Sequence, residues 1–161
     1  MSKNGVSLVL DKLADVTEGV QLLARLHVLV GIPEDKTDRR DDGPTNAELL
    51  YIHENGAPEV GIPARPTLKP GIKDAQIEIN RRLVLAGNAA LDGKPSSVRN
   101  QFAAAGQAGA SAVKAKINSN VGPALKPATL AARKRRGVKR TNTLVDTGQM
   151  RNAVTYVVEE N

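Results

Sequence analysis

An Asp-Thr-Gly triplet near the end of the chain is the group of residues that most directly suggests chemistry. It comprises Asp146, Thr147 and Gly148 and lies in the stretch LVDTGQM. Such a triplet begins the active-site loop of aspartic proteases, in which two carboxylates share one proton. A protease of the retroviral type needs several strands after that loop, whereas the residues after Gly148 have room for one strand.

A structural role for the triplet fits the sequence better than proteolysis. Asp146 and Gln149 have the spacing of a capping box, with aspartate in place of the usual Ser or Thr. We predict that Asp146 caps a helical turn, that Thr147 supports this turn, and that Gly148 relaxes the backbone.

A second candidate is the pair His53 and Glu54 in the stretch HENG. A zinc-protease signature needs a second histidine four residues after the first, and the two histidines of the chain are His27 and His53. A metal site would therefore need distant carboxylates. We expect His53 to lie on a helix face and to form a hydrogen bond. Since the chain also lacks a glycine-rich phosphate loop, we predict that it is not an enzyme and binds no metal or cofactor.

A dense basic cluster lies in the stretch ARKRRGVKRT. Its members are Arg133, Lys134, Arg135, Arg136, Lys139 and Arg140. Such a cluster can neutralise DNA phosphates, with an affinity that falls steeply with salt. No aromatic residues lie between the basic ones to stack on bases, so base-specific recognition is not expected. Three roles remain open: non-specific contact with DNA, contact with an acidic protein surface, or a solvated helix.

The elements that must position these residues begin with a helix, a strand and a loop. Apolar residues recur every three or four positions through residues 6–26, which predicts an amphipathic helix. The run HVLVGIP, residues 27–33, is short, apolar and β-branched, and predicts a strand buried on both faces. Residues 34–45 are polar and charged, and they predict a mobile loop.

Two further segments surround the His-Glu pair. Residues 46–56 resume helical spacing and end at Gly56, a natural left-handed helix stop. Prolines and glycines in residues 57–70 predict an extended arm. A stiff arm loses little entropy on binding, which suits a subunit interface, although a connector across the core fits equally well. The interface candidates are Ile62, Pro63, Arg65, Pro66 and Leu68.

The remaining elements are mostly helical. Pro70 suits the first turn of a helix that runs to about Leu91. An Ala- and Gly-rich helix and a short basic helix follow. After the Asp-Thr-Gly turn, the β-branched alternation in AVTYVVE predicts a final strand.

Composition favours a single domain, residues 1–161, that needs neighbours. One Phe and two Tyr are the aromatic residues, and Trp and Cys are absent. The core must therefore rely on Leu, Val, Ile and Ala. Alanine buries little apolar area, so part of the apolar surface is expected to need another subunit. No apolar run reaches the length of a membrane span, and we expect no membrane contact.

The two halves of the chain differ in charge. Residues 1–62 hold 6 basic and 11 acidic residues, and residues 63–161 hold 17 basic and 6 acidic residues. A basic half is typical of nucleic-acid contact. Opposite charges also suit copies of one chain that bind head to tail.

Three motif segments follow one another along the chain in a fixed order. Long predicted helices separate the second segment from the third. The first, residues 46–56, contains Asn46, Ala47, Glu48, Tyr51, Ile52, His53, Glu54 and Gly56. The second, residues 62–68, contains Ile62, Pro63, Ala64, Arg65, Pro66 and Leu68. The third, residues 144–156, contains Leu144, Asp146, Thr147, Gly148, Gln149, Met150, Arg151, Thr155 and Tyr156. The pattern resembles the virion-morphogenesis, or tail-completion, proteins of tailed bacteriophages. Asn55 and Thr67 stand where that family has aromatic residues.

The resemblance implies a fold, a role and partners. The implied fold is α+β, a ring-forming subunit with a small antiparallel sheet packed with several long amphipathic helices. The implied role is that of a structural virion protein in the neck, where a homo-oligomeric ring, hexameric or dodecameric, joins the tail to the head portal or connector and lets DNA pass through its lumen.

Implied partners are the chain itself, the neighbouring neck, connector and tail proteins, and genomic DNA held non-specifically. The implied location is the virion, after assembly in the cytoplasm of the bacterial host. The charge difference between the halves suits the head-to-tail contact of a closed ring. The alternative is a basic, non-specific DNA-binding protein.

Overall fold

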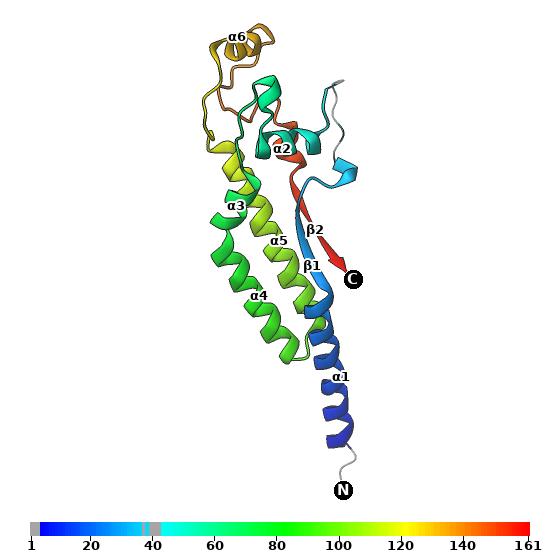
Figure 1. Ribbon diagram of the computed structural model, residues 1–161. Coiled ribbons are helices and arrows are strands. Elements are labelled where there is room, and N and C mark those ends of the chain that lie inside the picture. The colour runs from blue at the N-terminus through cyan, green and yellow to red at the C-terminus, as the bar shows by residue number, and fades with distance from the viewer. Residues whose placement is uncertain (1–3, 37, 39–42) are drawn as a thin grey trace. The chain divides into compact units, whose positions relative to one another are not determined.

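The computed structural model describes residues 4–36, 38 and 43–161, with side chains from residue 13 onward. The chain is α+β, as predicted, with a majority of helix and a small sheet (Figure 1). The helices are α1 (Asn4–Arg25), α2 (Asn46–Asn55), α3 (Leu68–Asp74), α4 (Gln76–Leu91), α5 (Pro95–Asn118), α6 (Pro127–Arg135) and α7 (Gln149–Ala153). Two 3-10 turns, η1 (Glu34–Lys36) and η2 (Pro58–Val60), lie between β1 and α3.

The sheet pairs two strands from opposite ends of the chain. β1 (Leu26–Gly31) and β2 (Thr155–Glu160) run antiparallel, and the backbone N–H of Asn161 donates to the carbonyl of Arg25 at 3.1 Å. Both strands were predicted. The expectation that β1 is buried on both faces is wrong, because Leu29 is 52% exposed. An antiparallel sheet with one solvated face buries alternate residues only.

The described chain divides into two compact units. Unit 1 comprises Met1–Leu29, Gln76–Ala108 and Val157–Asn161, and unit 2 comprises Val30–Ala75 and Gly109–Tyr156. The strands and α5 contribute residues to both units, so the chain passes between them several times. That residues 1–161 act as one domain remains a prediction.

Unit 1 is built on small side chains. Its core consists of Leu22, Leu26, Ala86, Ala89, Ala90, Val98 and Phe102. A Cβ added at Gly19 would lie 2.8 Å from the Cα of Ala90, so α1 and α4 pack with their backbones in close contact. The sequence predicted a core with few large side chains. The core of unit 1 fits this prediction, because three of its buried residues are alanines.

Unit 2 has larger apolar side chains at its centre. Its core consists of Leu50, Val113, Ile117, Leu144, Val145, Met150 and Val154. Gly71 lets α3 approach α5 closely, because a Cβ at that position would lie 2.8 Å from the Cα of Val113. This core holds residues of the third motif segment against α2 and α5.

The helix predicted from Pro70 to Leu91 is divided into two. α3 ends before Ala75, and α4 begins at Gln76. The extended arm predicted for residues 57–70 is correspondingly shorter, because helix begins at Leu68 and η2 interrupts the segment. The predicted mobile loop at 34–45 lies partly outside the described residues. Within the described part of the chain, no helix is long and apolar enough to cross a membrane.

Gly19→Ala and Gly87→Ala form a matched pair that tests the contact between α1 and α4. Each adds a methyl group to a helix and gains up to about 1 kcal/mol of helix propensity. At Gly87 nothing lies within 4 Å of the new Cβ, so the free energy of unfolding should rise. We expect Gly19→Ala to be about 1–3 kcal/mol less stable than Gly87→Ala, because α1 and α4 must separate. Urea denaturation of the two variants measures the difference, and equal stabilities would contradict the close approach.

Candidate functional site

Helix α2 carries His53 and Glu54 and has defined ends. Thr45 and Glu48 form a capping box, in which the Glu48 carboxylate accepts from the Thr45 backbone N–H at 2.8 Å and the Glu48 N–H donates to the Thr45 hydroxyl at 3.2 Å. Gly56 follows the helix with φ of 79°, as its predicted role as a helix stop requires. A Cβ at Gly56 would also lie 2.8 Å from the backbone nitrogen of Ala64. The first and second motif segments therefore pack backbone against backbone.

Glu54 connects the first motif segment to the helix that follows the second. Its carboxylate accepts hydrogen bonds from the backbone N–H groups of Thr67 at 2.7 Å, Leu68 at 2.9 Å and Lys69 at 3.1 Å. The first N–H groups of a helix have no partner within the helix. Glu54 satisfies those of α3 from 13 to 15 residues away, which explains why this helix begins at Leu68.

Arg65, predicted as an interface residue, is 6% exposed and packs within unit 2. Its backbone N–H donates to the carbonyl of His53, and its Nε donates to the carbonyl of Pro123 at 2.9 Å. Burial, and then the charge of Arg133, lower the pKa of Arg65. Of the other interface candidates, Pro66 is exposed, whereas Ile62, Pro63 and Leu68 are half-buried. Interface roles for these residues remain predictions.

Thr67 is fully buried, and its hydroxyl has no hydrogen-bond partner among the described residues. A buried hydroxyl without a partner is costly, and nothing in the structure explains the hydroxyl at this position.

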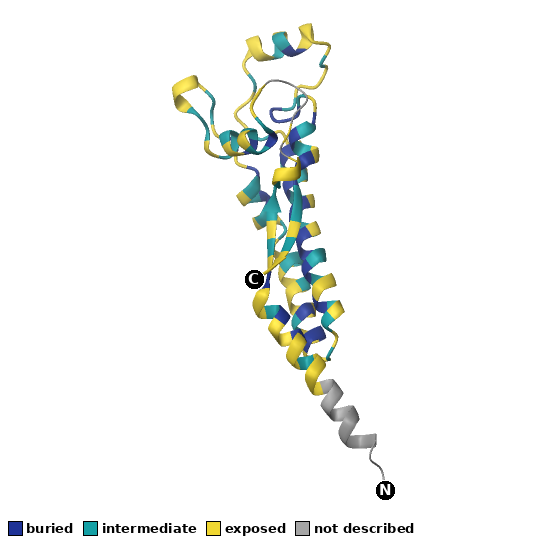
Figure 2. Ribbon diagram, turned by 90° about the vertical axis from the view of Figure 1, so that its right-hand side faces the viewer, coloured by how far each residue is buried: buried dark blue, intermediate teal, exposed yellow. Residues whose placement is uncertain are grey.

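Arg133 was predicted to face DNA or an acidic protein, but it is 6% exposed. Its Nη1 donates to the carbonyl of Asn142 at 2.6 Å and, at longer range, to those of Arg140 and Val145. Its Nη2 donates to the carbonyl of Thr143 at 3.4 Å. The guanidinium thus organises the loop after α6 and is not available to phosphate. Figure 2 shows α6 as largely exposed around this buried position.

Asp146 does not cap a helix, contrary to prediction. The residue before α7 is Gly148, with φ of 89° and no side-chain cap. The Asp146 carboxylate pairs instead with Arg136 at 2.8 Å and lies 3.8 Å from Nε of Arg133, which is an electrostatic contact and too long for a hydrogen bond. The roles predicted for the other two triplet residues fit, because the Thr147 hydroxyl accepts from the Gln149 N–H at 3.3 Å and Gly148 is left-handed.

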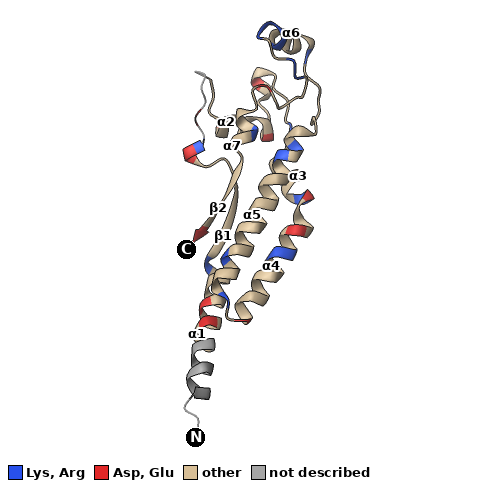
Figure 3. Cartoon of the chain, turned by 180° about the vertical axis from the view of Figure 1, so that it is seen from behind, with Lys and Arg blue, Asp and Glu red and all other residues tan. Residues whose placement is uncertain are grey.

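The basic cluster therefore divides by function. Arg133 is buried, Arg136 pairs with Asp146, and Arg140 donates to the carbonyl of Asp146 at 3.2 Å. Lys134, Arg135 and Lys139 are exposed, and their side chains form no hydrogen bond or ion pair with the described residues. Figure 3 shows basic residues gathered on α6 and the loop that follows it. Contact of this surface with DNA or an acidic protein remains a prediction, and Lys134, Arg135 and Lys139 are the members free to make it.

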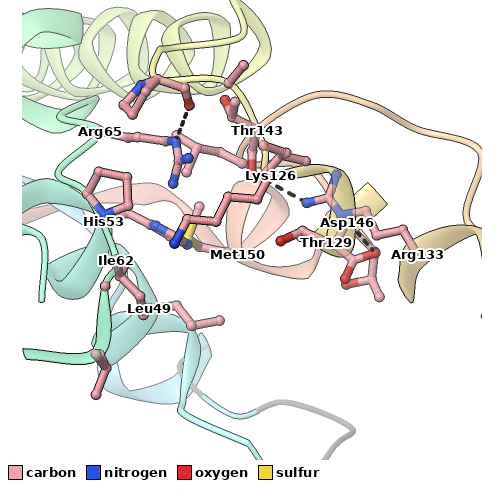
Figure 4. A pocket seen from close by; sticks show the side chains of 18 of the residues that line it. Leu49, His53, Ile62, Arg65, Lys126, Thr129, Arg133, Thr143, Asp146 and Met150 are labelled. Atoms are coloured by element: carbon pink, nitrogen blue, oxygen red, sulfur yellow. Dashed lines mark hydrogen bonds and ion pairs between the residues drawn. The ribbon is translucent and has the colours of Figure 1, made fainter. Parts of the chain in front are cut away.

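The three motif segments meet at one pocket in unit 2, with a volume of about 640 Å³. Its lining includes Leu49 and His53 of α2, Ile62 and Arg65 of the second segment, and residues 144 and 146–150 of the third. Figure 4 shows the side chains of His53, Arg65 and Lys126 converging on this space. His53 Nδ1 is buried without a hydrogen-bond partner, contrary to the expected hydrogen bond. Burial, followed by the charge of Arg65, lowers the pKa of His53.

The pocket of one chain holds one carboxylate of the two that an aspartic protease uses, because Asp146 is the single acidic residue of this lining. Among the described residues, no three His, Asp or Glu side chains are grouped so that they could hold a metal ion.

Comparison of the chain with protein-family models, curated proteins and solved structures finds no match. The resemblance to phage proteins therefore rests on the three motif segments alone and remains a prediction. Sequence reasoning selected those segments but missed the contacts that join them. Glu54, an acidic residue near the end of α2, was the one feature of the sequence that could have indicated these contacts. Its position in the sequence does not show that it caps α3.

Glu54→Ala tests the link between the first and second motif segments. It leaves the backbone N–H groups of Thr67, Leu68 and Lys69, at the start of α3, without their acceptor, so we expect a loss of about 1–3 kcal/mol in the free energy of unfolding. Amide hydrogen exchange at Leu68 and Lys69 should also accelerate. The matched control is Glu59→Ala, which removes an exposed carboxylate and should change stability by less than about 0.5 kcal/mol. Equal effects of the two changes would contradict the capping role.

Arg133→Met and Arg135→Met compare two neighbouring cations of α6. Removal of Arg133 leaves buried carbonyls unsatisfied and Asp146 without one of its two cations, so we expect a loss of about 3–5 kcal/mol. Arg135 is exposed, and its replacement should cost less than about 0.5 kcal/mol. Thermal denaturation measures both, and a fully stable Arg133→Met variant would contradict the structural role.

Proposed function

We propose that this chain is a structural virion protein of a tailed phage. It forms a ring in the neck, joins the tail to the head portal or connector, and lets DNA pass. The observation that carries the proposal is the convergence of the three motif segments in unit 2. Segments that are up to about ninety residues apart in the chain line one pocket, and the first and second are hydrogen-bonded to each other, as expected if the pattern describes one structural unit rather than three chance matches.

Contacts between particular motif residues support this interpretation. Glu54 of the first segment holds the helix that follows the second, and the backbone of Arg65 in the second donates to His53 in the first. In the third segment, Asp146 pairs with Arg136 and lies beside Arg133. The motif residues thus have structural partners, which suits a building block of a particle.

An outward apolar stripe on α4 favours assembly with other subunits. Ile77, Val84 and Leu91 are 86%, 64% and 70% exposed. They lie seven residues apart, which places them on one face of the helix, opposite the buried Ala86 and Ala90. Large apolar side chains at such spacing are typical of a helix that another helix covers. In a ring, this covering helix belongs to a neighbouring subunit.

The exposed basic residues give the alternative function its support. Lys134, Arg135 and Lys139 have no acidic partner among the described residues and can face phosphate or an acidic protein. In a neck ring, this surface lies toward the lumen or toward an acidic neighbour. In a free DNA-binding protein, it would carry the whole affinity.

Phage particles made without this chain test the proposal. We expect a stop codon in its gene to yield full heads and finished tails that remain separate in negative-stain images. The intact chain supplied in trans should restore joined particles. Normal joined particles in its absence would contradict the neck role.

A variant in which Gln replaces Lys134, Arg135 and Lys139 distinguishes the neck role from the alternative, non-specific DNA binding. It leaves Arg133 and its loop in place, so the fold is retained. If this variant restores joined particles, DNA contact by these residues is incidental to joining. If the gene is dispensable for joining and the free chain binds duplex DNA in a manner that this variant loses, DNA binding is the function.

A further inference from the structure

The pocket of unit 2 contains a charge that its own residues do not neutralise. Arg65 is 6% exposed, yet of its side-chain N–H groups only that on Nε has a hydrogen-bond acceptor among the described residues. Its two terminal nitrogens have none, and Figure 4 shows the guanidinium at the wall of the pocket. These nitrogens are not fully enclosed by the described residues, so they face the open space of the pocket. A guanidinium that is held by a largely buried side chain and keeps free donors toward a pocket suits a site that an anion completes.

The rest of the lining has the same sign. Lys126 extends into the pocket, and Arg133 also lines it, beside Asp146. The one acidic lining residue, Asp146, is already paired with Arg136 and Arg133. The pocket therefore has a net positive charge, and it attracts an anion from solution.

His53 adds a second polar group without a partner. Its Nδ1 is buried and forms no hydrogen bond with the described residues. The ring lies next to Arg65, and the backbone N–H of Arg65 donates to the backbone carbonyl of His53. An anion bound at Arg65 would thus lie close to a ring nitrogen that has no other use in the fold.

Apolar side chains complete the lining and restrict the class of anion. Leu49, Ile62, Leu125 and Met150 contribute apolar side chains to the lining. A bare inorganic anion would leave this surface in contact with water, whereas an anion attached to an alkyl group would cover it.

We propose that this pocket binds a carboxylate that bears a short apolar group. The terminal nitrogens of Arg65 donate to the two carboxylate oxygens, a geometry that guanidinium groups favour. Lys126 closes the site electrostatically, and the apolar residues receive the alkyl group. The ligand is a free carboxylic acid or the carboxyl terminus of a polypeptide, which share this chemistry. The proposal is independent of the neck role, because it rests on the pocket alone.

Titration of the intact chain followed by ¹H–¹⁵N NMR tests the proposal. Hexanoate is the first probe, and hexanol, which has the same alkyl chain without charge, is its control. We expect hexanoate to shift the amide signals of residues that line the pocket, with a Kd on the order of 1 mM, and hexanol to leave them unchanged. Bound carboxylate should also raise the pKa of His53, which can be followed through its ring signals.

Two variants assign the interaction to named residues. Arg65→Lys keeps the charge but not the paired donors, and it should weaken hexanoate binding roughly tenfold or more. Lys126→Glu reverses the charge at an exposed lining position and should weaken binding by a similar factor. Lys134→Glu makes the same change of net charge on α6, away from this pocket, and should have little effect. If Arg65→Lys does not fold, the comparison of Lys126→Glu with Lys134→Glu decides.

A peptide probe distinguishes the two sources of the carboxylate, a free carboxylic acid and the carboxyl terminus of a polypeptide. An acetylated tripeptide that ends in leucine with a free carboxylate is compared with its amide. Binding of the free-carboxylate peptide at least tenfold tighter than hexanoate supports a polypeptide terminus, and equal or weaker binding supports a free acid. The proposal is overturned if neither acid binds, if hexanol or the peptide amide binds equally well, or if inorganic phosphate binds more tightly than hexanoate. Equal losses in Lys126→Glu and Lys134→Glu would also overturn it.

Discussion

The buried guanidinium of Arg133 is the interaction on which the organisation of unit 2 depends. A charge removed from water is stable only when polar groups surround it, and here the carbonyls of residues 140, 142, 143 and 145 take that role. These carbonyls belong to one irregular loop, which must therefore curve around α6. The curvature brings the Asp-Thr-Gly triplet to the same pocket as α2. A triplet that resembles catalytic machinery in sequence is thus part of the structural support of a loop.

A second polar contact has the same logic on the other side of the pocket. Glu54 supplies acceptors for the first turn of α3, and the positive φ of Gly56 lets the chain turn back to Ala64. In both cases, at Arg133 and at Glu54, a side chain binds backbone groups that lie several residues away in the sequence. Unit 2 therefore depends on polar connections between segments as well as on its apolar core, whereas unit 1 depends on close approach of helices that carry glycine and alanine. Unit 1 also leaves apolar surface exposed in the stripe on α4, which we propose a neighbouring subunit covers.

Local patterns in the sequence predicted the elements, and they failed where a distant partner decides. The helices, the stop at Gly56 and the final strand follow from periodicity, φ preference and β-branching, which neighbouring residues determine. The burial of Arg133 could not be predicted, because a run of basic residues has the same composition whether or not one member turns inward. The cap from Glu54 and the solvated face of β1 depend on which segments meet in space. The pocket was missed for the same reason, although most of its polar residues had been singled out one by one.

The most direct test of the account is cryo-electron microscopy of purified virions, with the map examined at the junction between head and tail. The account predicts a closed ring of copies of this chain at that junction, in which the apolar stripe of α4 contacts a neighbouring subunit and DNA or its channel runs through the centre. Absence of the chain from purified particles, or its presence only at another location, would contradict the account.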